Sequence, residues 1–116
     1  MSFTPNWTPV AERAFNELRA AAEQAAVSRA GAKRTKASKQ EGLFKQVAKA
    51  IGFLLNDPKH PGLQTHEYSS IPHPFEPNGK VFEAYAQDKT PGAYRIFWCY
   101  GPGQGVITII AITPHP

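Results

Sequence analysis

The chain has 116 residues, enough for one domain with its own hydrophobic core and too few for a two-domain enzyme. Hydrophobic residues make up 41% of the chain, charged residues 19%, and the net charge is +4, which excludes a disordered chain. The one cysteine, Cys99, excludes a disulfide framework and a cysteine-based zinc site. The sequence shows neither a secretory signal nor an apolar run of membrane-spanning length, so we expect a cytoplasmic protein that does not bind membranes.

The first predicted element is a helix over residues 9–30. Thr8 followed by Pro9 is typical of a helix start, and apolar residues then recur at helical spacing as far as Ala25. Gly31 ends the pattern.

A second helix is predicted over residues 38–56. Ser38 and Glu41 have the spacing of a capping box, in which each side chain binds a backbone N–H at the helix start. An apolar stripe follows, and Pro58 lies just beyond the end. A short connection joins the two helices, so we expect an αα-hairpin.

Residues 64–113 are predicted to form an antiparallel sheet. Strand-like segments cover 80–87, 93–100 and 106–113, and a short edge strand lies within 64–69. The loops between the three longer strands are short enough for hairpins. The chain is therefore predicted to be a single α+β domain, residues 1–116, with the helical hairpin packed on the sheet.

The side chains of the two sheet faces follow from an assumed register, in which Tyr100 pairs with Val106 and Gln87 with Ala93. One face is then almost wholly apolar and would carry the helices: Phe82, Ala84, Ala86, Tyr94, Ile96, Trp98, Tyr100, Val106, Thr108, Ile110 and Ile112. On the other face, Arg95 lies across from Tyr85 and diagonal to Glu83.

The second face would also carry an apolar patch, formed by Phe97, Cys99, Ile107 and Ile109. A monomer would rather cover such a patch. A partner peptide, a second copy of the chain in a homodimer, or residues 2–7 would cover it.

Positive charge is concentrated in the helical half. Residues 1–60 hold ten Lys or Arg against five Asp or Glu, a net charge of +5, whereas residues 61–116 have a net charge of −1. Such a surface attracts polyanions through counterion release, and a solvated helix face is the alternative. The candidate RNA-binding residues are Lys33, Arg34, Lys36, Lys45 and Lys49.

Three histidines in the middle of the chain, His60, His66 and His73, suit zinc by residue type when combined with Glu67. Their spacings of six and seven residues do not match the patterns that chelate well. No metal or other cofactor is therefore predicted, and these residues are expected to be loop histidines.

The order of elements and two short motifs resemble the RelE/ParE toxin superfamily. The motifs are Asp-Pro-Lys-His-Pro-Gly-Leu at residues 57–63, which leads from the second helix into the sheet, and Tyr94-Arg95-Ile96. The resemblance implies a toxin of a type II toxin–antitoxin system with a cognate antitoxin as partner. In the RNA-cleaving branch, an arginine in this strand and often a histidine near the C-terminus act on messenger RNA in the ribosomal A site.

Arg95 matches that arginine by position, and His115 is similar to the terminal histidine, although Pro116 stands where the family commonly has an aromatic residue. The resemblance implies a ribosome-dependent, metal-independent mRNA endonuclease that inhibits translation. Two alternatives stay open. One is a non-enzymatic ParE-like inhibitor of a protein such as gyrase, and the other is a catalytically inactive relative.

RNA cleavage without a metal requires a base, an acid and a cation for the charge on the phosphate. Arg95 suits the cation, Glu83 the base and His115 the acid, and Tyr85 would stack on a nucleobase or donate a hydrogen bond. The structural alternatives are an Arg95–Glu83 salt bridge, packing of Tyr85 on the sheet and a solvated His115.

Overall fold

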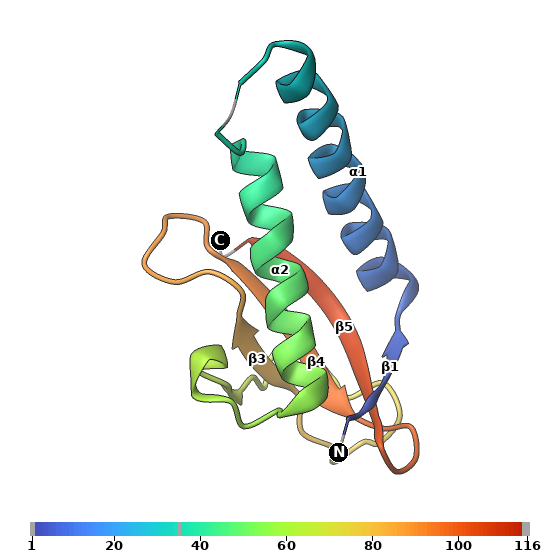
Figure 1. Ribbon diagram of the computed structural model, residues 1–116. Helices are drawn as coiled ribbons and strands as arrows, with labels where there is room; N and C mark the ends of the chain where they lie inside the picture. Colours follow the sequence, from blue (N-terminus) through green and yellow to red (C-terminus); the bar gives the residue numbers. More distant parts are fainter. Residues whose placement is uncertain (1, 35, 115–116) are drawn as a thin grey trace.

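The computed structural model describes residues 2–34 and 36–114 and shows two helices against one face of a five-stranded sheet (Figure 1). The elements follow in the order β1 (Thr4–Trp7), α1 (Pro9–Gly31), α2 (Lys39–Asn56), the 3-10 turn η1 (Pro61–Leu63), β2 (His66–Glu67), β3 (Phe82–Tyr85), β4 (Tyr94–Tyr100) and β5 (Val106–Pro114). The α+β class is therefore confirmed. The molecule measures 52 × 26 × 25 Å and is elongated because the helices project beyond the sheet (Figure 1).

Capping side chains fix where both helices begin. The Thr8 hydroxyl accepts a hydrogen bond from Ala11 N at 3.0 Å, with Pro9 in the first turn of α1. At the start of α2, Glu41 N donates to Ser38 Oγ at 3.2 Å and Ser38 N donates to a Glu41 carboxylate oxygen at 2.7 Å. The predicted capping box is therefore present, with Ser38 as the cap residue.

The sheet is mixed, and the prediction of a wholly antiparallel sheet is wrong. Its strand order is β1-β5-β4-β3-β2, and β1 runs parallel to β5, with Thr4 paired to Val106. A side-chain hydrogen bond of 3.0 Å from Asn6 Nδ2 to Thr108 Oγ1 joins the two strands. The four residues of β1 include Pro5, which an edge strand tolerates and which masks the strand in the sequence.

The predicted register between β4 and β5 is also wrong, and β5 contains a bulge. Tyr100 pairs with Ile107 rather than Val106, Trp98 pairs with Ile109, and Phe97 pairs with Ala111. One residue of β5, Ile110, is therefore left over at the register shift.

Between the hairpin loop and the bulge, the side chains of β5 lie on the opposite faces from those predicted, and beyond the bulge Ile112 lies on the predicted face. Ile107 and Ile109 lie in the hydrophobic core beneath the helices, where the sequence predicted Val106, Thr108 and Ile110. The buried core is formed by Ala11, Val47, Ala50, Ile51, Leu54, Leu63, Ala84, Ile96, Trp98, Ile107, Ile109 and Ile112.

The apolar part of the second face is covered by the chain itself. The Tyr68 ring lies 4.7 Å from the Phe97 ring, and Cys99 is fully buried. Burial raises the pKa of the Cys99 thiol to about 11, with a smaller contribution from the nearby Glu76 carboxylate. Residues 2–7 do not cover this surface, because their strand β1 pairs at the β5 edge of the sheet.

The loop at residues 69–79 is fastened by a histidine. His73 Nδ1 accepts hydrogen bonds from Phe75 N and Glu76 N, each at 3.1 Å. Its Nε2 lies 3.2 Å from the Tyr100 carbonyl oxygen and donates to it, because Nδ1 is already an acceptor. Within the described ranges, no helix is long and apolar enough to cross a membrane.

Candidate functional site

Three strands bring four polar or aromatic side chains together on the sheet face away from the helices. Tyr85 of β3 pairs with Arg95 of β4, as the sequence predicted, and Glu83 of β3 pairs with His66 of β2. Their neighbours along the strands, such as Ala84 and Ile96, point into the core beneath the helices, so the alternation of side chains places this group on the opposite face. We call these four residues the Arg95 cluster.

Glu83 is the centre of the cluster. Its side chain is only 7% exposed, and both carboxylate oxygens have a partner. Oε1 lies 2.7 Å from His66 Nε2, and Oε2 lies 3.1 Å from Arg95 Nη1. A buried carboxylate is costly unless it is paired in this way, so these contacts explain how the strand accommodates Glu83.

Arg95 is held by Glu83 on one side and by an aromatic ring on the other. Its guanidinium carbon lies 4.0 Å from the centre of the Tyr85 ring, within the range of a cation–π contact. Among the described residues, no acceptor is within hydrogen-bond reach of its buried Nε. An unpaired buried donor of this kind costs about 1–3 kcal/mol.

His66 is the residue that sequence reasoning missed. Its side chain is 48% exposed, its Nδ1 lies 3.3 Å from the Gln64 carbonyl oxygen, and its ring meets the Tyr85 ring edge-on at 5.8 Å. Knowledge that His66 pairs with Glu83 would have identified it, because this pairing places both side chains on one face. A two-residue strand after a proline-rich segment gives no pattern from which to derive that register.

Three of the four predicted catalytic residues, Arg95, Glu83 and Tyr85, converge in this cluster. The fourth, His115, lies outside the described residues. The salt bridge between Arg95 and Glu83, which the sequence offered as the structural alternative, is also present.

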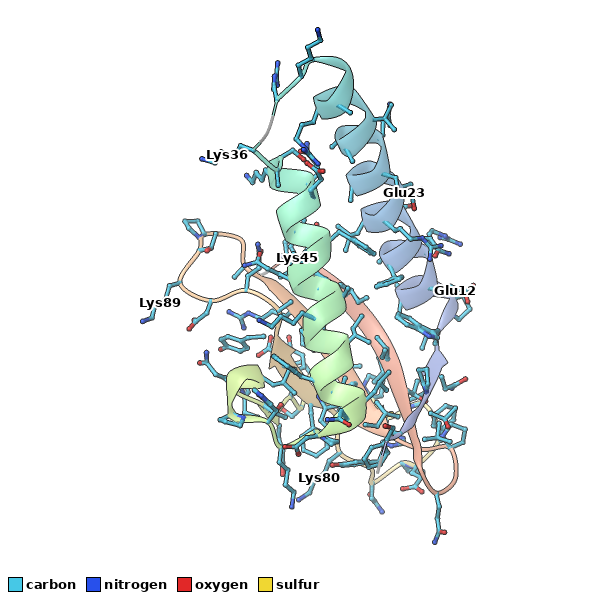
Figure 2. All side chains as sticks on the ribbon, viewed as in Figure 1. Glu12, Glu23, Lys36, Lys45, Lys80 and Lys89 are labelled. Atoms are coloured by element: carbon cyan, nitrogen blue, oxygen red, sulfur yellow. The ribbon has the colours of Figure 1, made fainter. Side chains whose placement is uncertain are left out.

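The predicted RNA-binding lysines and arginine do not form one surface. Lys49 lines a hollow of about 200 Å³ together with Tyr85, between α2 and η1, and therefore lies near the Arg95 cluster. Lys45 is exposed on the middle of α2 (Figure 2).

The other three, Lys33, Arg34 and Lys36, are exposed at the connection between the helices, where Figure 2 labels Lys36. We call these three residues the basic tip. At 1.5 Å per helical residue, this connection is about 20 Å from Lys49. Arg34 and Lys36 border a hollow of about 430 Å³ there, together with Arg29.

The remaining histidines have structural roles of their own. His60 stacks on Phe53 with ring centres 4.1 Å apart, and its Nδ1 accepts a hydrogen bond from Gly62 N at 3.0 Å. His73 fastens the 69–79 loop. In the part of the chain that the structure describes, no three His, Cys, Asp or Glu residues are placed to bind a metal ion.

No protein-family model matches the chain, and no curated protein matches it. A solved structure that is similar is the crystal structure of an archaeal RelE–RelB complex from Pyrococcus horikoshii OT3. The TM-score is 0.56 at 12% sequence identity, and the match covers 98% of this chain and 96% of the other. The fold is therefore RelE-like.

Proposed function

We propose that this chain is the toxin of a toxin–antitoxin system and that it cleaves messenger RNA on the ribosome. The RelE-like fold supports a toxin, and the presence of RelB in the similar structure supports an antitoxin as the partner of this chain. One observation favours a nuclease over an inhibitor of a protein target. Arg95, Glu83 and Tyr85 converge on the sheet face opposite the helices. Figure 1 shows that both helices lie on the other face.

Arg95 is the residue that would stabilise the reaction. In cleavage by the 2′-hydroxyl, negative charge gathers on the phosphate, and a fixed guanidinium lowers the energy of that state. Glu83 and Tyr85 hold the guanidinium before any substrate arrives, so little reorganisation is needed at the moment of reaction.

The other predicted residues take different parts in this proposal. Both oxygens of Glu83 are engaged, so its role is to hold Arg95 and His66 rather than to act as a free base. Lys49, which lines a hollow with Tyr85, and Lys45, one turn earlier on α2, would contact the message, whereas the basic tip would contact ribosomal RNA. His115, which the sequence suggested as the acid, lies outside the described residues.

The test is translation-coupled cleavage of a defined message by the purified protein and ribosomes, comparing the parent with Arg95→Ala. We expect position-specific cuts that fall by about 100-fold or more in the variant, because one charge-stabilising group is removed. Arg19→Ala is the matched control, since Arg19 is an exposed arginine on α1 whose partners are Asn16 and Glu23. It should cut like the parent.

Arg95→Ala leaves Glu83 without its arginine, which is destabilising for a buried carboxylate. Thermal unfolding of each variant therefore accompanies the cleavage assay. The double variant Glu83→Gln/Arg95→Ala removes both charges and serves if the single variant does not fold. A folded parent that makes no cuts would overturn the nuclease and leave the gyrase-type inhibitor or the inactive relative.

A further inference from the structure

We propose that His66, in place of His115, is the catalytic residue that donates the proton to the leaving oxygen of the RNA, and that Glu83 positions it. This inference rests on the nuclease function proposed above. It begins from accessibility, because a proton donor must touch the substrate. Within the Arg95 cluster, the His66 ring is half-exposed, whereas the Glu83 carboxyl is largely buried.

Each nitrogen of the His66 ring faces an acceptor. Nε2 faces the Glu83 carboxylate at 2.7 Å and Nδ1 faces the Gln64 carbonyl oxygen at 3.3 Å, so both nitrogens meet acceptors. A neutral imidazole has one N–H, and only the imidazolium has a donor for each contact. Glu83 can therefore hold the ring by Nε2–H both before and after Nδ1 gives up its proton.

The charged groups that face the ring set the net charge of the cluster. Tyr85 and Glu83 face it from β3, and Arg95 reaches it from β4 through Glu83. On its own strand side, the Gln64 side chain is hydrogen-bonded to Asp88 at 3.0 Å. Arg95 already compensates Glu83, so a protonated His66 gives the cluster a net positive charge, which suits a phosphate.

The step is balanced without a metal or a redox partner. The 2′-oxygen attacks phosphorus, the bond from phosphorus to the 5′-oxygen breaks, and the Nδ1 proton of His66 passes to that 5′-oxygen. The 2′-hydroxyl proton passes to water. The products are a 2′,3′-cyclic phosphate and a 5′-hydroxyl, and His66 regains a proton from water.

Only Nδ1 is available for this transfer. The contact to Gln64 is long for a hydrogen bond and lies on an exposed edge strand, so a substrate oxygen can replace the carbonyl as the acceptor. Nε2 is held by a short contact to a buried carboxylate. The geometry therefore separates the nitrogen that is anchored from the nitrogen that reacts.

The experiment uses two messages that differ in one atom. One carries the ordinary 5′-oxygen at the cut site, and the other carries a bridging 5′-sulfur, which leaves as a thiolate and needs no proton. The full chain with ribosomes is compared with His66→Gln. We expect a loss of about 100-fold or more on the oxygen message, the usual contribution of a general acid, and the parent rate on the sulfur message.

Two controls separate chemistry from structure. His60→Gln replaces a histidine outside the cluster and should cut both messages like the parent. Arg95→Ala should stay slow on both messages, because the charge on the phosphate still develops. Thermal unfolding checks the fold of each variant, and His66→Asn replaces His66→Gln if the latter does not fold.

The other possible results contradict either the role of His66 or the nuclease function. If His66→Gln cuts the oxygen message at the parent rate, or is slowed equally on both messages, His66 is not the proton donor and the nuclease function stands. If the folded parent cuts neither message, the proposed function fails, and this inference fails with it.

Discussion

His66 and His73 show how the same side chain takes opposite roles through the groups that its nitrogens meet. His73 Nδ1 accepts from two backbone N–H groups, so the ring holds the 69–79 loop together. Both nitrogens of His66 face acceptors instead. The first arrangement stabilises a loop, and the second suits proton donation.

The loop fastener depends on the absence of a side chain at Gly79. A Cβ built there would lie 2.3 Å from His73 Cδ2, so Gly79→Ala must displace the ring. We expect a loss of stability of about 1–3 kcal/mol, as for overpacking of a filled site, and faster proteolysis within residues 69–79. Thermal unfolding and limited proteolysis measure both.

Gly52→Ala is the matched control, because nothing lies within 4 Å of a Cβ at that position of α2. It should be stabilising by about 0.5–1 kcal/mol, since alanine has the higher helix propensity. A Gly79→Ala protein that melts at or above the parent temperature would show that the His73 ring does not hold the loop.

At the scale of elements, the sequence predicted what local rules control. Thr8, Ser38 and Glu41 mark helix starts through hydrogen bonds to residues only three positions away. Strand β1 depends instead on a partner about 100 residues further along, so nothing near Pro5 indicates it. The bulge at Ile110 leaves no mark either, because an isoleucine suits both faces of this strand.

The candidate site divides in the same way. Arg95 and Tyr85 are on adjacent strands of a short hairpin, so alternation alone placed them opposite one another. His66 joins Glu83 only through the two-residue strand β2, which alternation cannot place in register. His66, the most exposed residue of the cluster, was therefore the one that could not be predicted from the sequence.

The connection between α1 and α2 makes a contribution to stability that depends on pH. Hydrogen bonds from the Arg29 guanidinium, together with one from Ser38 N, hold the pKa of the Glu41 carboxyl at about 2, below its ordinary 4.5. A lowered pKa means that this contribution to stability is complete above pH 4.5 and is lost as the pH falls toward 2.

Glu41→Gln keeps a side chain able to complete the cap but removes the charge that faces Arg29. We expect the variant to melt below the parent at neutral pH, with a gap that closes as the pH falls from 4.5 to about 2. Glu17→Gln, an exposed position on α1, is the control. Melting temperatures across this range test it, and a gap that stays constant would contradict the assignment.

At the scale of the whole molecule, the basic tip and the Arg95 cluster are separate surfaces of an elongated protein. The helices extend past the sheet and carry Lys36 away from the strands, as Figure 2 shows. A separation of this kind lets one end bind RNA through phosphates alone, while the other end acts on a chosen bond.

Neutralising the basic tip should therefore change the salt dependence of ribosome binding more than the chemistry. For Lys33→Asn, Arg34→Gln and Lys36→Gln combined, we expect the slope of log affinity against log salt to flatten by about 0.7–0.9 for each phosphate that the variant no longer neutralises. Asparagine suits position 33, where φ is 58°. Arg13→Gln with Arg19→Gln is the control, and an unchanged slope in the triple variant would remove the tip from RNA binding.

The parallel pairing of β1 with β5 has a consequence for folding during synthesis. β1 is made among the first residues, yet its partner residues begin at Val106, and β5 also separates β1 from the rest of the sheet. During synthesis β1 cannot pair until nearly the whole chain has been made, since such distant contacts form late. An unpaired strand edge can pair with strands of other chains and aggregate. Pro5 lacks a backbone N–H, which makes β1 a poor template for such pairing before β5 has been made.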